Sequence, residues 1–260
     1  MIIALLIISL LSLSVYIFMQ HPKFGRLPAG ERLERIKESP NYKDGKFQNL
    51  RFTPDLTEGE TIFTVLRDFL FTKKPRLKPI DSIPSMKTDL LNLDSGMDLL
   101  VWFGHSSYFI QIDGKKIWLI RYSVVRFRLF RLPPKHLRGL TLISLMIFLK
   151  LIISSLHDHW DHLDYETVLK LKSKINKVIC GLGTGEHLEY WGFDKNRIIE
   201  KDWNEKIVLD SGFIVHTTPA RHFSGRGFQR NKTLWTSFVL KTPSMNLFIG
   251  GDGGLRHLFC

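Results

Sequence analysis

Cysteine is scarce in this chain, with two residues, Cys180 and Cys260, among 260. Two cysteines are too few for a disulfide framework, and neither belongs to a C-x-x-C pair, which argues against a cysteine-bound zinc ion. Internal repeats and low-complexity tracts are also absent, which excludes a repeat architecture. With 44% hydrophobic residues, the chain can bury one sizeable core and carry a smaller appendage.

Charge is absent from residues 1–19, which are almost entirely apolar. About twenty such residues span the hydrocarbon core of a bilayer, so a transmembrane anchor is the first interpretation. A cleaved signal peptide is the alternative, but a basic n-region and a small-x-small cleavage site before Gln20 are both missing. The positive-inside rule predicts that the basic flank, and with it the catalytic domain, is cytoplasmic at a bacterial inner membrane. This flank contains Lys23, Arg26, Arg32, Arg35 and Lys37.

Acidic residues are absent from residues 121–156, which contain seven basic ones. The segment supplies +7 of the formal net charge of +12 and leaves +5 for the rest of the chain. A nucleic-acid interpretation of the basic composition therefore loses most of its support, and no nucleic-acid partner is predicted. The apolar run at 140–156 is short for a membrane span and contains Lys150, so a second transmembrane helix is not predicted.

Residues 157–162 read His-Asp-His-Trp-Asp-His, and this run carries the most chemical information in the chain. Divalent metals such as zinc bind imidazole nitrogen and carboxylate oxygen, and they need several such groups converging. His157 and His159 can reach one ion from a loop, and Asp161 and His162 can reach a second. A buried strand at 151–155 precedes the run, and Asp164 can cap a following helix at 164–175. The pattern predicts a metal site on a loop between a strand and a helix.

The pattern along the chain predicts an N-terminal extension at 20–96, a linker and packing arm with short helices near 30–38 and 61–71. The main domain is expected at 97–260, with a hairpin turn at Asp113-Gly114 and a helix at 186–191 that ends before Gly192. Strands in hairpins mixed with helices predict a layered α/β fold with mixed sheets. The predicted strands of this domain are 99–103, 107–112, 116–120, 206–209, 213–218, 235–241 and 246–249.

Four motifs together resemble the metallo-β-lactamase-fold hydrolases. They lie at 102–107 (Trp-Phe-Gly-His-Ser-Ser), 157–162, 218–226 (Thr-Pro-Ala-Arg-His-Phe-Ser-Gly-Arg) and 250–253 (Gly-Gly-Asp-Gly). The third motif is similar to the branch that holds N-acylphosphatidylethanolamine-hydrolysing phospholipase D and the L-ascorbate-6-phosphate lactonases. The resemblance implies a four-layered αββα fold and a site for two zinc ions.

The resemblance also implies a role for each site residue. His157, His159 and His222 would bind one zinc, Asp161 and His162 the second, and Asp252 would bridge both ions. Asp161, His162 and Asp252 would then serve catalysis through a hydroxide bound by the two metals. Four further residues are expected to support the ligands or to contact substrate: Asp158, His105, Arg221 and Arg226. For Arg221 and Arg226 the alternative is that they are ordinary surface arginines.

Two departures from the family pattern bear on activity. Residues 121–156 lack the Asp-Pro loop of the family, and one hypothesis is that about 121–155 are translated out of frame, with a basic, membrane-touching insert as the alternative. The chain stops at Cys260, eight residues after Asp252, where the resemblance implies further strands, helices and one more histidine ligand. An incomplete second half of the fold would expose apolar surface and weaken or abolish turnover.

Three function classes follow from these observations. The first is a membrane-associated, zinc-dependent phosphodiesterase of phospholipase D type that acts on N-acyl phosphatidylethanolamine-like lipids. The second is a lactonase of a small phosphorylated substrate. The apolar segment 1–19 argues against it, because an enzyme that acts on a soluble metabolite does not need a membrane anchor. The third is an inactive fragment that binds at most one zinc. Nucleases of the same fold form another enzyme class. This class is not favoured, because the sequence has no basic-aromatic stretch outside 121–156 that would bind a nucleic acid.

Overall fold

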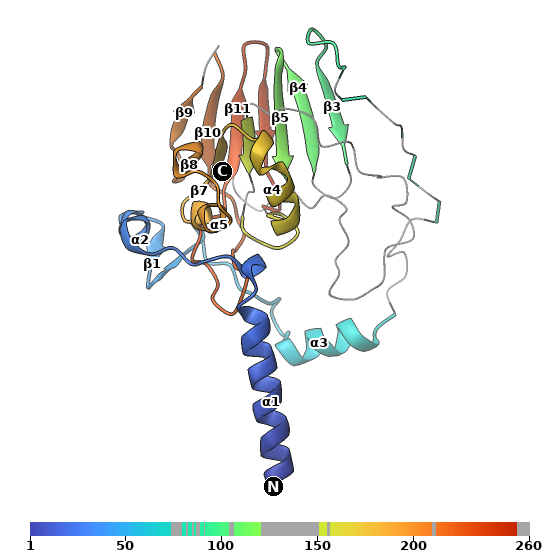
Figure 1. The fold of residues 1–260 in the computed structure, drawn as a ribbon, viewed down its shortest axis with the longest axis vertical. Helices are drawn as coiled ribbons and strands as arrows, with labels where there is room; N and C mark the ends of the chain where they lie inside the picture. Colours follow the sequence, from blue (N-terminus) through green and yellow to red (C-terminus); the bar gives the residue numbers. More distant parts are fainter. Residues whose placement is uncertain are drawn as a thin grey trace.

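Two β-sheets stacked face to face form the body of the protein, and an isolated N-terminal helix projects from it (Figure 1). Their facing sides form one apolar core, in which Ile110 and Ile117 of the larger sheet meet Val215 and Phe238 of the smaller one. This computed structural model describes residues 1–73, 80–81, 83–84, 86, 89–90, 92–103, 107–120, 151–154, 157–209 and 212–253.

The larger sheet has six strands in the order β3-β4-β5-β6-β7-β8. Its first three strands are antiparallel, and the strands from β5 to β8 are parallel, so that β5, β6, β7 and β8 end at the same edge. Loops at that edge can therefore meet. The strands are β3 (Leu99–Trp102), β4 (Tyr108–Ile112), β5 (Lys115–Ile120), β6 (Leu151–Ser154), β7 (Val178–Gly181) and β8 (Ile198–Lys201).

The smaller sheet has four antiparallel strands in the order β12-β11-β10-β9. Because β11 lies between them, β10 and β12 run in the same direction and end at the same edge. Among the described residues no helix covers the outer face of this sheet, where Phe248 and Val208 are exposed. The strands are β9 (Lys206–Val208), β10 (Ile214–Thr218), β11 (Ser237–Lys241) and β12 (Asn246–Ile249).

Two helices cover the outer face of the larger sheet, α4 (Tyr165–Leu171) and α5 (Thr184–Tyr190) (Figure 1). Val168 of α4 and Leu188 of α5 pack with Phe109 in a second apolar cluster. Side chains alternate along a strand, so β4 sends Phe109 towards the helices and its neighbours towards the other sheet. The described residues thus form an αββ arrangement, three of the four layers expected from the sequence. Short 3₁₀ helices follow at η2 (Lys172–Lys174) and η3 (Lys195–Arg197).

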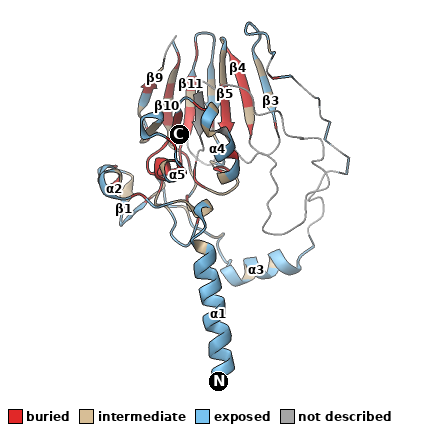
Figure 2. Cartoon of the chain, viewed as in Figure 1, coloured by how far each residue is buried: buried red, intermediate tan, exposed pale blue. Residues whose placement is uncertain are grey.

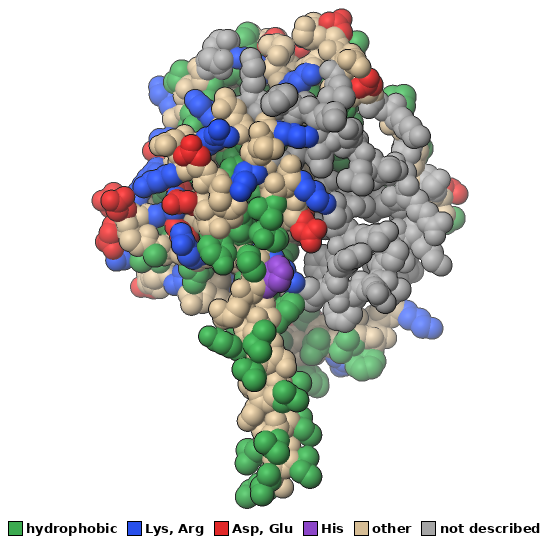
Figure 3. Space-filling view, in the orientation of Figure 1, with side chains coloured by type: hydrophobic (Ala, Val, Ile, Leu, Met, Phe, Trp, Pro, Cys, Tyr) green, Lys and Arg blue, Asp and Glu red, His purple; other side chains and the backbone are tan. Residues whose placement is uncertain are grey.

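The N-terminal part begins with α1 (Ile2–Met19), whose residues are almost all exposed (Figure 2). In the described part of the chain it is the one helix long and apolar enough to cross a membrane, a test that signal sequences also pass. Apolar side chains cover it along its length (Figure 3). The chain continues through η1 (Pro22–Phe24), α2 (Gly30–Lys37), the hairpin strands β1 (Tyr42–Lys43) and β2 (Lys46–Phe47), and α3 (Ile62–Phe71).

The predicted strands and helices are confirmed, with shifts of a few residues at their ends. The turn at Asp113 and Gly114 has two positive φ angles, 45° and 72°, as the Asp-Gly pair predicts. The strand expected at 235–241 begins only at Ser237, because Trp235 turns its indole to the carbonyl oxygen of Ala220.

The strand expected at 151–155 is confirmed as β6, which pairs in register with β5 and β7 in the middle of the sheet. The out-of-frame origin suggested for residues 121–155 stays a prediction. Residues 121–150 themselves, and His105, lie outside the described residues, as do residues 254–260.

A buried ion cluster holds α2 against the domain. Arg32 donates from Nε to Glu200 at 2.7 Å, and its other nitrogens pair with Glu186 and Glu189. The side chains of Glu186 and Glu200 are only 6% and 8% exposed. Burial alone would lower the pKa of Arg32, but the three carboxylates raise it instead. The extension is thus fixed by charge as well as by the apolar contacts of Ile36 with the domain.

Replacing Arg32 by methionine is expected to lower the free energy of unfolding by about 3 kcal/mol, because it leaves buried carboxylates without their cation. Lys37→Met is the matched control on the same helix, since Lys37 forms an exposed pair with Glu34 and should cost under about 1 kcal/mol. Chemical denaturation of the full chain in detergent measures both. Equal losses for the two variants would contradict the role given to the cluster.

Candidate metal centre

Three loops meet at one edge of the two sheets, and each follows the end of a strand. The loop after β6 carries the His157–His162 run, the loop after β10 carries His222, and the turn after β12 carries Asp252. Because β10 and β12 end at the same edge, and core packing joins the two sheets, residues far apart in the sequence come together, such as His157 and His222, which are 65 positions apart. The fold therefore positions metal-binding side chains from rigid strands.

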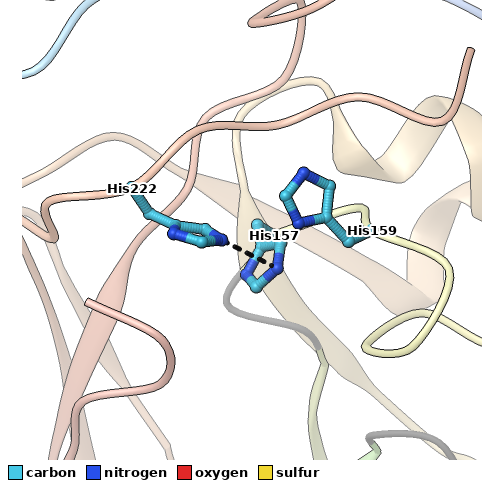
Figure 4. Close-up of side chains that lie close together, drawn as sticks. All are labelled: His157, His159 and His222. Atoms are coloured by element: carbon cyan, nitrogen blue, oxygen red, sulfur yellow. Dashed lines mark hydrogen bonds between the residues drawn. The ribbon is translucent and has the colours of Figure 1, made fainter. Parts of the chain in front are cut away.

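The first ligand group consists of His157, His159 and His222, whose ligand atoms lie within 4.8 Å of one another (Figure 4). The Nε2 atoms of His157 and His222 are 3.2 Å apart. Two imidazole nitrogens that share a tetrahedral zinc at 2.0–2.1 Å are about 3.3 Å apart, so this pair fits such an ion. Burial lowers the pKa of His159, which favours the neutral imidazole that a metal requires.

The second ligand group consists of His157, His162 and Asp252, again within 4.8 Å. His162 Nε2 lies 2.6 Å from a carboxylate oxygen of Asp252 and 3.2 Å from one of Asp161. The structure thus brings together the residues expected at a second ion, and it adds His157, which the two groups share. The side chains of Asp161 and Asp252 are 48% and 34% exposed, so the site is open to a substrate.

Asp158, expected to support the ligands, is buried behind the loop. One carboxylate oxygen lies 3.1 Å from Nε2 of His187, and the other accepts from the amide of Gly225 at 2.6 Å. Burial alone would raise the pKa of Asp158, but the hydrogen bond and charge of His187, with Arg226 and the Gly225 amide, hold it below its usual value. Asp158 therefore stays ionised and ties the first loop to the loop of His222.

Arg226 lies behind the metal loop, not in the open site. Its guanidinium donates to the carbonyl oxygens of Asp158 at 2.8 Å and Leu163 at 2.7 Å, and it is sandwiched between the rings of Trp160 and Trp191. Burial lowers its pKa to about 10, so it remains charged near neutral pH. Its position fits a role in shaping the loop and not contact with a substrate phosphate.

Arg221 donates from Nε to the hydroxyl of Thr53 at 3.1 Å, beside the His222 backbone.

Two residues that contact the site, Asn49 and His187, were not predicted from the sequence. Asn49 forms two hydrogen bonds with the backbone of His222, at 2.9 and 3.1 Å, and His187 accepts the amide of Arg26 at Nδ1. Asn49 comes from the extension, 173 residues away, and no motif marks it.

Comparison with known proteins agrees with this geometry. Residues 149–256 match the family described as the beta-lactamase superfamily domain. An uncharacterized protein of Mycobacterium tuberculosis is 35% identical over 236 residues, and the nematode N-acyl-phosphatidylethanolamine-hydrolyzing phospholipase D 1 of Caenorhabditis elegans is 26% identical over 243. These matches cover 86% and 85% of this chain, but it spans only 60% and 64% of the relatives' lengths.

Among solved structures, the metallo hydrolase Igni18 of the archaeon Ignicoccus hospitalis is 22% identical, with a TM-score of 0.42. The likeness covers 61% of this chain and 62% of Igni18.

Replacing His222 by alanine is expected to remove about one equivalent of bound metal, because it takes one of three nitrogens from the first ligand group. His216→Ala is the matched control, since His216 lies on β10, the strand that leads to His222, and in neither ligand group. Elemental analysis of the zinc-loaded full chain gives the metal content. Equal metal content in the two variants would contradict the assignment.

Arg226→Met is expected to destabilise the fold by roughly 3 kcal/mol, because it leaves several buried carbonyl oxygens without donors. Arg230→Met is the matched control in the same loop, where Arg230 is 43% exposed and pairs with exposed Asp55. Thermal unfolding compares the two, and metal content should fall only in the first. An unchanged melting temperature for Arg226→Met would refute the role in shaping the loop.

Proposed function

We propose that the chain is a metal-dependent hydrolase of membrane phosphodiesters, a proposal supported by the match of residues 149–256 to the beta-lactamase superfamily domain. The observation that carries the proposal is the pair of ligand groups that share His157 at the open edge of the sheets. Two adjacent divalent ions are the arrangement found in many phosphodiester-cleaving enzymes. The printed name of the nematode relative supports a phospholipid of the N-acyl phosphatidylethanolamine type as substrate.

We infer that the ions are zinc, since imidazole nitrogens and carboxylate oxygens are donors that zinc binds. His157, His159 and His222 would hold one ion, Asp161 and His162 would hold the other, and Asp252 would serve both. When bound, the pair would polarise a phosphoryl oxygen and lower the pKa of a water molecule. The protein's own part is to keep the His159 imidazole neutral by burial and to hold the two loops in register through Asp158.

Membrane anchoring through α1 is part of the proposal, with the domain on the cytoplasmic side. The length and composition of α1 fit a membrane span, and the turn that follows it contacts the metal loop directly. Phe24 packs edge-on against Trp160, with ring centroids 4.6 Å apart, and the carbonyl oxygen of Lys23 accepts from Arg226. This short connection favours a lipid over a soluble lactone as substrate.

The zinc-loaded full chain, reconstituted in liposomes, is expected to cleave N-acyl phosphatidylethanolamine into phosphatidic acid and an N-acylethanolamine. Asp252→Asn should lower the rate by more than about 100-fold, because losing residues that merely orient ligands already costs 10–100-fold. Asp55→Asn, at an exposed carboxylate outside both ligand groups, is the control. Mass spectrometry of the products measures the rate.

Two outcomes of this assay would refute the phosphodiesterase proposal. One is a zinc-loaded chain that leaves the lipid intact but opens a small phosphorylated lactone, which would favour the lactonase alternative. The other is lipid cleavage that Asp252→Asn does not change, which would place the chemistry outside the two ligand groups.

A further inference from the structure

The helix α3 exposes an unusual amount of apolar surface. Seven of its ten residues are large and apolar, and all seven side chains are exposed. Phe63 and Phe69 are 77% and 78% exposed, and no residue of the helix is buried. Contiguous apolar surface of this kind marks a contact with a membrane or another molecule. The seven residues are Ile62, Phe63, Val65, Leu66, Phe69, Leu70 and Phe71.

The helix is well formed despite this exposure. Thr61 and Thr64 form a capping box at its start, which satisfies backbone amides that the helix leaves open. Its polar side chains gather on one side, because Arg67 and Asp68 follow Thr64 by three and four positions. The apolar residues occupy the rest of the circumference, the pattern of a helix that lies in a lipid interface.

The orientation of α3 agrees with that pattern. Its axis runs across the direction of α1 (Figure 1). If α1 crosses a bilayer along the membrane normal, α3 lies roughly in the plane of the membrane surface. A helix so placed buries its apolar face among lipid headgroups and upper acyl chains without crossing the bilayer.

Further exposed phenylalanines lie in segments that connect α1 with the metal ligands. Phe228 is 82% exposed, and its neighbour Gly227 touches the last residue of α1: a Cβ on Gly227 would lie 3.0 Å from the terminal methyl of Met19. Phe52 is 91% exposed, three residues after Asn49, which binds the His222 backbone. Apolar exposure thus extends from α1 into both segments that flank His222.

We propose that α3, Phe52 and Phe228 form a lipid-facing surface that rests in the headgroup region of the membrane crossed by α1. One anchoring helix leaves a domain free to rotate about it, whereas a second contact through α3 fixes its orientation. The metal centre is then held at the interface, where a lipid headgroup can reach it. The inference rests on the proposed anchoring by α1, but it does not depend on the proposed hydrolysis.

The test places an environment-sensitive fluorophore at single cysteines in the full chain, reconstituted in phosphatidylcholine–phosphatidylglycerol liposomes. Cys260→Ser removes the second native cysteine, and Cys180 is buried and does not label. Phe69→Cys probes the apolar side of α3, Arg67→Cys is the matched control on its polar side, and Leu10→Cys reports on α1.

Iodide in the water is expected to quench the fluorophore at residue 69 several-fold less than the one at residue 67, because lipid shields the apolar side of α3. Lipids with nitroxides near the headgroup should quench the fluorophore at residue 69 strongly. Equal access of iodide to both positions, with residue 10 quenched only by lipid, would overturn the lipid-facing surface and leave the anchor intact. Protection of residue 69 from both quenchers would overturn it in favour of a protein partner or a second copy. Access of iodide to residue 10 would overturn the anchoring, and this inference with it.

Discussion

The hydrogen bonds of the buried Arg226 guanidinium hold the loop of residues 157–163 in its conformation. The guanidinium donates to carbonyl oxygens of Asp158 and Leu163 within the loop and of Lys23 in the turn after α1. A buried cation is tolerated only when its donors are satisfied, so these segments have to meet around it. Asp158 carries the opposite charge beside it and holds the neighbouring loop through Gly225. One charge network therefore fixes two of the three ligand loops.

The N-terminal extension also supports the candidate metal site. Its helix α2 is held by Arg32 among three carboxylates, and its hairpin buries Phe47 beside Trp235. Asn49 follows that hairpin and binds both the His222 backbone and the indole of Trp235. The packing of the extension therefore positions His222, one of the candidate metal ligands. Losing this contact would loosen His222 even with every ligand in place, because supporting contacts set ligand orientation.

Only the family resemblance added His222 and Asp252 to the expected ligands. The sequence itself predicted most strands of the two sheets, the hairpin at Asp113-Gly114 and a metal site at 157–162, because alternation, turn chemistry and the spacing of the histidine run are local signals. It could not predict Asn49 or the partner of Asp158, because those contacts join residues 173 and 29 positions apart and carry no motif. Arg226 was marked by its motif, yet the pattern did not distinguish a residue facing substrate from one behind the loop. That distinction comes from burial, which only tertiary packing determines.

The path from α1 to the metal centre contains no flexible linker. Four residues separate Met19 from Phe24, so the chain between them can span at most roughly 18 Å, and hydrogen bonds and ring contacts hold most of it. A flexible tether would let the domain sample many orientations, whereas this turn packs on Trp160, between the proposed ligands His159 and Asp161. Such rigidity brings no advantage for a substrate that diffuses in water. It agrees with the proposed anchoring by α1 and with a substrate confined to the bilayer, because the site would then stay within reach of the headgroup.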